Sequence, residues 1–92
     1  MLESEIMKYL KEFFPGTSNH RRIPIVGGEV VKVDWDYAGR TLRIDLFKDI
    51  KGCIAYVKQG ERVLAMSSVE KTFASCFKQL KERLQERLVT WS

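Results

Sequence analysis

The sequence is poor in the residues that catalytic and metal sites most often use. It holds one histidine, two cysteines and two prolines in 92 residues. The histidine, His20, stands in a polar stretch, and neither a nucleophile motif nor a phosphate-binding glycine loop occurs. Cys53 and Cys76 are far apart and lack a CxxC spacing, so we expect free thiols. These absences predict a protein that is not an enzyme and carries no metal or cofactor.

Long apolar runs are absent as well. No stretch approaches the ~20 apolar residues that a spanning helix needs, which excludes a transmembrane segment. The first residues, Met1 to Glu5, lack the positive-then-apolar order of a secretory signal. Reduced thiols and the missing signal together predict a cytoplasmic protein with no membrane partner.

The composition that remains is that of an ordinary globular domain, with 45% hydrophobic and 30% charged residues. We expect a single domain over residues 1–92, because two cores in so short a chain would each have too little interior. The net charge of +4 permits a polyanionic partner without requiring one. Nucleic-acid binders usually concentrate their charge on one face, so the position of the charges decides.

Apolar periodicity predicts an α+β fold with an N-terminal helix, an antiparallel β-meander of four to five strands and a long C-terminal helix. Residues 2–14 repeat apolar side chains at the helical period until Pro15 ends the helix. Residues 17–22 then read as a polar loop. Glycine-containing breaks separate β-branched runs, and the strands are predicted near residues 22–26, 29–37, 40–48, 53–58 and 61–66. Pro24 confines the first strand to an edge.

The second predicted hairpin specifies its own register. If Ala38 and Gly39 form its loop, apolar residues pair on one face and opposite charges pair on the other. The apolar pairs are Trp35–Leu42, Val33–Ile44 and Val31–Leu46, and the charged pairs are Asp34–Arg43 and Lys32–Asp45. A slip by one residue would destroy both sets. On the charged face the same register pairs Val30 with Phe47 and brings Ile25 close, which predicts a small apolar corner.

The last predicted hairpin is apolar on both faces. With Gln59 and Gly60 as its loop, the two faces carry Ile54, Tyr56, Val63 and Ala65, and Cys53, Ala55, Val57, Leu64 and Met66. One of these faces therefore needs cover from a neighbouring helix or from a partner surface.

The final helix is predicted to begin at a capping box formed by Ser67 and Glu70. Its run from Val69 to Trp91 would measure about 35 Å at ~1.5 Å per residue. A sheet of this size is only about 20–25 Å wide, so we expect the helix to overhang it. The overhanging part carries Leu84, Leu88, Val89 and Trp91. Either helix 2–14 covers these residues or another subunit does, which would make a homodimer through the C-terminal helix.

Two functions fit these patterns. The first is a small non-catalytic binding protein that docks on a nucleic acid or nucleoprotein complex through a basic loop and the basic C-terminal helix. The residues expected to contact phosphates are His20, Arg21, Arg22, Lys71, Lys78, Lys81, Arg83 and Arg87. The charged sheet face is not expected to bind RNA, because acidic residues outnumber basic ones there and exposed aromatic residues are missing.

The alternative is a protein–protein interaction module, an inhibitor or adaptor such as a phage-encoded inhibitor of a host complex. It would act through apolar patches on the sheet and the last helix. The residues expected to contact the partner are Ile25, Val30, Phe47, Leu84, Leu88 and Trp91.

Two short stretches are similar to a known family. Asp36-Tyr-Ala-Gly-Arg-Thr-Leu-Arg-Ile44 and Val69-Glu-Lys-Thr-Phe73 resemble the small Alu-domain subunits of the signal recognition particle, as does the order helix, meander, helix. That resemblance implies RNA binding by basic residues of the sheet. The chain departs from the family at the acidic residues Asp34 and Asp36 and in its extra hairpin around Gly60, so we do not assign it to the family.

Overall fold

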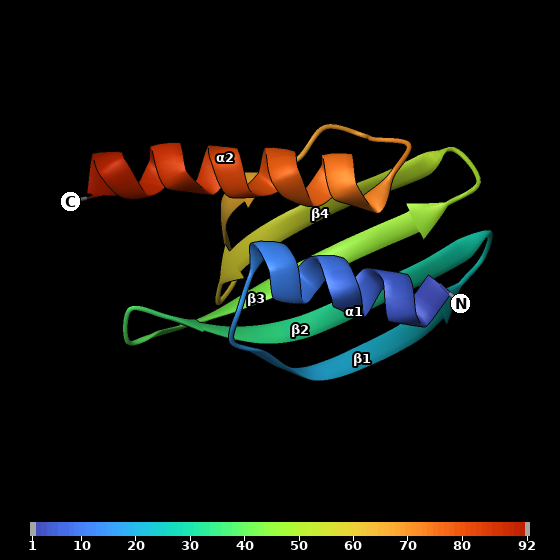
Figure 1. The fold of residues 1–92 in the computed structure, drawn as a ribbon, viewed down its shortest axis with the longest axis horizontal. Helices are drawn as coiled ribbons and strands as arrows, with labels where there is room; N and C mark the ends of the chain where they lie inside the picture. The colour runs from blue at the N-terminus through green and yellow to red at the C-terminus, as the bar shows by residue number, and fades with distance from the viewer. Residues whose placement is uncertain (1, 92) are drawn as a thin grey trace.

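Two helices lie on one side of a five-stranded antiparallel sheet (Figure 1). This computed structural model describes the backbone of residues 2–91 and the side chains of residues 5–87. The helices are α1 (Leu2–Phe13) and α2 (Phe73–Trp91). The strands follow one another across the sheet as β1 (Thr17–Ile25), β2 (Gly28–Tyr37), β3 (Arg40–Asp49), β4 (Gly52–Gln59) and β5 (Arg62–Met66). The predicted α+β class and the order of its elements are confirmed.

The register between β2 and β3 is the predicted one. Trp35 pairs with Leu42 and Val33 pairs with Ile44. All four side chains point to the helix-covered face, where none is more than 5% exposed. Because side chains alternate along a strand, this register fixes which residues of both strands face the helices and which do not.

Apolar residues of both helices complete the core against this face. They are Ile6, Leu10 and Phe14 at α1, and Phe73, Cys76, Phe77, Leu80 and Leu84 on α2. The Phe14 ring packs edge-on against the Trp35 ring at 5.2 Å between centroids. The Trp35 indole N–H donates a hydrogen bond of 2.9 Å to the carbonyl oxygen of Pro15. The end of α1 is therefore tied to β2 by both an apolar and a polar contact.

The stretch predicted to be a polar loop is instead the first half of β1. The strand runs from Thr17 to Ile25 at the edge of the sheet, with an irregularity in its pairing between Ser18 and Arg21. Every residue after Thr17 is exposed, so the strand has no buried face and no apolar alternation that the sequence could display. Pro24 lies in this edge strand, as predicted.

The predicted capping box is wrong, and α2 begins six residues after Ser67. Residues 67–72 continue alongside β4, where Cys53 and Glu70 exchange two backbone hydrogen bonds of 2.8 Å. This pairing holds the backbone extended beyond Ser67. The side chain that caps the helix is Thr72, whose Oγ1 accepts a bond of 3.1 Å from the Ser75 amide.

The last hairpin turns one residue later than predicted. Gln59 pairs with Arg62, and the register then shifts between Val57 and Lys58. Two consecutive residues of β5, Leu64 and Ala65, are consequently both buried, and Met66 lies on the face away from the helices. The sequence pattern had placed Met66 on the opposite face.

The predicted overhang of α2 does not begin at Leu84. This side chain is 2% exposed, and it lies with Phe13 and Phe14 beside the end of α1. Helix 2–14 therefore provides the cover at this position. Leu88, Val89 and Trp91 lie outside the described side chains.

Ser67 tests the structure of this region, because its hydroxyl joins β4 to α2. Its Oγ accepts a hydrogen bond of 2.9 Å from the Ala55 amide and lies 3.2 Å from Cys76 Sγ. Ser67→Ala leaves the Ala55 amide buried without a partner, so we expect it to lower the free energy of unfolding by about 1–3 kcal/mol. Urea unfolding measures this change.

Ser68→Ala is the matched control, since its exposed hydroxyl accepts only a solvent-accessible hydrogen bond of 3.2 Å from Arg83. We expect a change of no more than about 0.5 kcal/mol for it. If the two variants unfold at the same urea concentration, Ser67 does not hold the contacts described.

Candidate functional site

The sheet side away from the helices is uncovered within the described part of the chain, and we call it the open face. Its residues come from all five strands: Arg21, Ile23, Ile25, Val30, Lys32, Asp34, Asp36, Thr41, Arg43, Asp45, Phe47, Asp49, Ile54, Tyr56, Lys58, Val63 and Met66. No helix of the described residues is long and apolar enough to cross a membrane.

The predicted basic loop does not form one site, because β1 sends its residues to opposite sides of the sheet. Arg21 pairs with Lys32 on the open face, where its Nη2 lies 3.2 Å from Asp34 Oδ1. Arg22 faces the helix side and forms an ion pair of 2.7 Å with Glu29. His20, also in β1, lines a small pocket with Arg22 and with Ile6 of α1 on the helix side.

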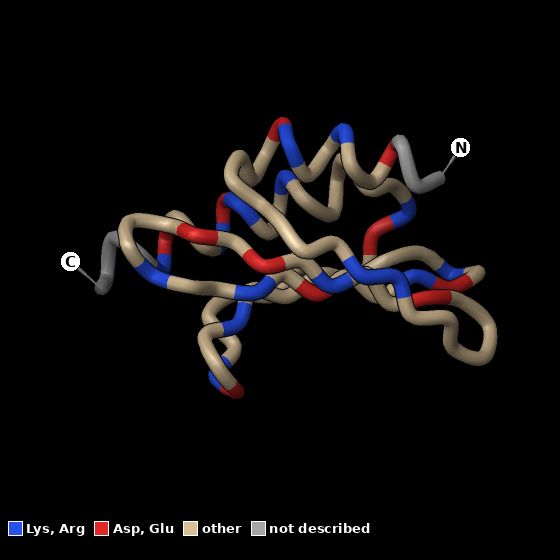
Figure 2. The backbone as a smooth tube through the Cα atoms, turned by 90° about the horizontal axis from the view of Figure 1, so that it is seen from below, with Lys and Arg blue, Asp and Glu red and all other residues tan. Residues whose placement is uncertain are grey.

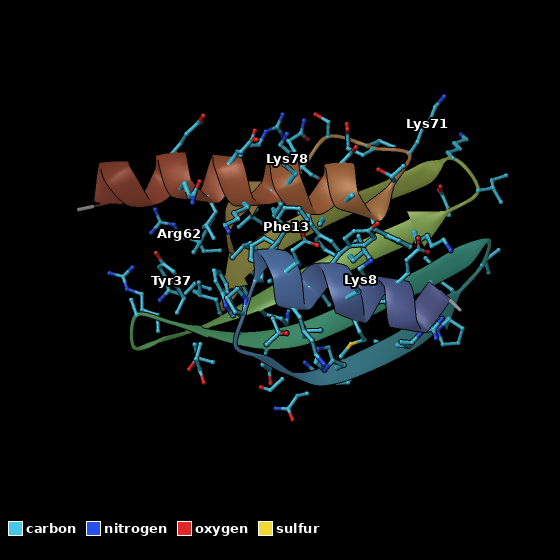
Figure 3. All side chains as sticks on the ribbon, viewed as in Figure 1. Lys8, Phe13, Tyr37, Arg62, Lys71 and Lys78 are labelled. Atoms are coloured by element: carbon cyan, nitrogen blue, oxygen red, sulfur yellow. The ribbon has the colours of Figure 1, made fainter. Side chains whose placement is uncertain are left out.

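The basic residues of α2 are divided as well. Lys81 lines a cavity beside α1, whereas Arg83 and Arg87 line a shallow groove beside β5. Arg83 also holds the end of β5, since its Nη1 donates a 2.6 Å bond to the Met66 carbonyl. Figure 3 shows Lys71 extending away from the body of the molecule, on the side remote from β1.

Positive and negative residues are accordingly interspersed over the whole fold. Figure 2 shows basic and acidic segments alternating along the strands and the helices, rather than gathered on one side. The eight residues predicted to contact phosphates point in several directions. A continuous basic face built from β1 and α2 is therefore absent from the described residues.

The open face has an apolar end. Ile23 of β1, Val30 of β2, Phe47 of β3 and Ile54 of β4 lie directly beside one another in one row across the strands. Ile25 follows Ile23 on the same face. The predicted apolar corner is thus formed, and it is wider than the sequence indicated because Ile23 and Ile54 join it.

The outcome for the predicted partner-contact residues is mixed. Ile25 is 45% exposed and Phe47 is half-buried, so both are accessible on the open face. Val30 is only 5% exposed, because its neighbours in the row cover it, and Leu84 is buried in the core. Neither of these two offers contact area to a partner. Leu88 and Trp91 lie outside the described side chains.

Next to the apolar row, the open face carries an ion cluster around Asp45. Arg43 Nε lies 3.1 Å from Asp45 Oδ1, and Lys58 Nζ lies 3.2 Å from Asp45 Oδ2. The Arg43 contact lacks the alignment of a hydrogen bond. The Asp45 side chain is 1% exposed, whereas those of Arg43 and Lys58 are 39% and 25% exposed. The carboxylate therefore lies underneath, and a molecule that approaches this face meets the two cations first.

Two half-buried aromatic residues lie on the open face, where the sequence analysis expected none. Phe47 and Tyr56 pack edge to face, with ring centroids 5.6 Å apart and an interplanar angle of 86°. The Lys58 ammonium lies over the Tyr56 ring, 5.7 Å from its centroid. Their strand positions could have indicated a shared face, but the sequence offers no signal for the ring geometry.

On the helix-covered side, two buried thiols join β4 to α2. Cys53 and Cys76 are both free. The hydrogen bond between the two thiols lowers the pKa of Cys76, with a further contribution from Ser67. The same bond, together with burial, raises the pKa of Cys53. Among the described residues, no group of three or more His, Cys, Asp or Glu side chains could hold a metal ion.

The ion cluster should contribute to stability as well as to the surface. Asp45→Asn removes the charge that faces Arg43 and Lys58, while a buried Arg43 Nε keeps its need for a partner. We expect the free energy of unfolding to fall by roughly 1–3 kcal/mol. Asp36→Asn, an exposed change on the same face, should alter it by about 0.5 kcal/mol or less. Equal urea midpoints for the two variants would contradict a structural role of Asp45.

No protein-family model, curated protein or solved structure matches this chain. The resemblance to Alu-domain subunits therefore gains no support from a family match. The open face combines an apolar row with an ion cluster, so it is the candidate functional surface of the described residues.

Proposed function

We propose that this protein is a protein–protein interaction module, an inhibitor or adaptor, which binds the apolar, partly acidic surface of another protein on its open face. One observation carries the proposal: an uncovered sheet face on which an apolar row adjoins cations that lie above their carboxylates. Large exposed apolar patches that are rimmed by polar residues mark protein-binding surfaces.

The apolar row supplies the contact area for such a partner. Antiparallel sheets commonly leave one face in water, and that face is then polar. Here Ile23, Ile25 and Met66 are between 43% and 45% exposed on it. The face spans about 20 Å across its strands, at ~4.8 Å per strand, and about 30 Å along them. This area is comparable with the ~800 Å² that each partner contributes to a standard interface.

The open face carries four basic and four acidic side chains, and in its ion pairs the basic partners are the more exposed. Asp45 is covered by Arg43 and Lys58, and Asp34 is bound by Asn19 at 2.8 Å and by Arg21 at 3.2 Å. The exposed parts of these ion pairs are mainly the basic side chains. Complementary potentials speed association and exclude wrong partners, so acidic groups on the partner fit this half of the face.

Nucleic-acid binding is less well supported by the same surface. Bases of single strands stack on free aromatic rings. The Tyr56 ring is instead covered by Lys58, and Phe47 packs against it at a near right angle. The aliphatic side chains of the row offer neither stacking nor hydrogen bonds. The distribution of basic residues over several directions also removes the single basic face that phosphate binding favours.

Site-specific photo-crosslinking in the cells that naturally produce the protein tests the proposal. A benzophenone amino acid replaces Phe47 on the open face, and in a matched variant it replaces Lys78, which is exposed on the outer side of α2. We expect a discrete protein adduct from position 47 and none from position 78. The captured protein should then bind the purified chain in a defined complex.

Charge-neutralising variants provide the second readout. Arg21→Gln with Lys32→Gln removes two open-face cations without touching the ion pairs of Asp45. We expect the double variant to bind the captured protein about tenfold more weakly at low salt. The loss should be smaller at high salt, because exposed charges are screened.

Three crosslinking results would contradict the proposal. They are an RNA or DNA adduct at position 47, an adduct with a second copy of the chain, and equal capture at positions 47 and 78.

A further inference from the structure

The two cysteines of the chain meet in the interior, between β4 and α2. The helix lies alongside the strand (Figure 1), and both side chains are buried. The Thr72 carbonyl oxygen lies 3.5 Å from Cys53 Sγ and accepts a bond of 3.1 Å from the Cys76 amide. Two residues that are distant in sequence thus share one acceptor, and their thiols lie on facing sides of the seam between helix and sheet.

Hydrogen bonding gives the two sulfurs different chemical roles. The bond from Cys53, with a smaller contribution from Ser67, lowers the pKa of Cys76. The same bond between the thiols, together with burial, raises the pKa of Cys53. Ser67 Oγ accepts its bond from the Ala55 amide, so its one proton is left to donate to Cys76 Sγ, 3.2 Å away. When the pair loses a proton, the negative charge therefore lies on Cys76, and Cys53 keeps its S–H.

A cavity gives small molecules access to one side of this pair. It has a volume of about 340 Å³ and lies between α1, the β3–β4 turn and the segment before α2. Tyr9, Lys48 and Lys71 line it, and Cys53 forms part of its wall. A water molecule takes up about 30 Å³ of the liquid, and hydrogen peroxide is little larger than water. Such a molecule can therefore reach the Cys53 sulfur while the fold stays closed.

We propose that Cys53 and Cys76 form an oxidation site, at which hydrogen peroxide converts the two thiols into a reversible disulfide that fastens α2 to β4. The bridge closes the loop 53–76 covalently, which restricts the unfolded chain and so stabilises the folded one. Both sulfurs lie on the helix-covered side of the sheet. The inference is therefore independent of the proposed function, which uses the open face.

The oxidation proceeds in two steps. In the first, the Cys53 sulfur attacks one oxygen of hydrogen peroxide while its proton passes to the Cys76 thiolate. The O–O bond breaks, and the departing hydroxide removes that proton from Cys76 as water, which leaves a sulfenic acid on Cys53. In the second step, the Cys76 thiolate attacks the Cys53 sulfur, the S–O bond breaks, and the hydroxide leaves as water with a proton from solvent. Two electrons pass from the thiols to the peroxide. A dithiol such as dithiothreitol reverses the bridge by exchange.

Mass spectrometry of the peroxide-treated protein tests the site. We expect the peptides that contain Cys53 and Cys76 to be joined within a monomer, with the loss of two hydrogen atoms. Dithiothreitol should restore both thiols, whereas any methionine sulfoxide remains, so the dithiothreitol-treated sample is the matched control. The bridged protein should unfold at a urea concentration about 2 M higher than this control.

Ser67→Ala separates oxidation through the cavity from oxidation in a partly unfolded chain. The change removes the donor to Cys76 and keeps both sulfurs, so we expect the bridge to form about tenfold more slowly. The same change destabilises the fold, and oxidation that required α2 to open would become faster instead. Ser68→Ala, the matched control, should be oxidised at the wild-type rate.

Three results would overturn the inference. The first is oxidation of the wild type that yields no bridge between the two cysteines, whether the product is a dimer linked by disulfides or a sulfinic acid on Cys53. The second is a bridged protein that unfolds at a lower urea concentration than its reduced control, because the bridge would then distort the fold. The third is a Ser67→Ala variant that forms the bridge at the wild-type rate or faster.

Discussion

The antiparallel register between β2 and β3 decides on which side of the sheet every other group lies. It places Trp35 and Ile44 under the helices, and the same alternation places Phe47 and Asp45 on the open face. The remaining strands extend this arrangement outwards from the central pair. A shift by one residue would bury charges beneath α1 and α2 and would bring the core to the surface. The core and the candidate binding surface thus depend on one constraint and cannot vary independently.

That register could be predicted because both of its faces carry a signal. Apolar pairs on one side and opposite charges on the other agree on a single alignment. β1 carries no such signal, because an exposed edge strand has no buried face, and its polar residues resembled a loop. The bulge in β5 was also invisible, since Leu64, Ala65 and Met66 are all apolar and any alternation fits them.

The candidate site shows the same limit of sequence reasoning. The corner formed by Val30 and Phe47 followed from the register, but Ile23 could be added only once β1 was known to pair along its length. The basic residues were grouped by their neighbourhood in the chain, whereas a strand sends neighbours to opposite sides. The capping box failed because Glu70 bonds to Cys53, a contact that is distant in sequence.

The contact between the two thiols has a practical consequence for following the motions of this protein. Cys76 is fully buried on the sheet-facing side of α2, and Cys53 lies opposite it on β4. A thiol reagent can reach Cys76 only when α2 separates from the sheet or the chain unfolds, so the labelling rate reports this opening. Binding on the open face leaves this seam untouched. A partner on that face can slow the labelling only by stabilising the folded state against the opening that exposes Cys76.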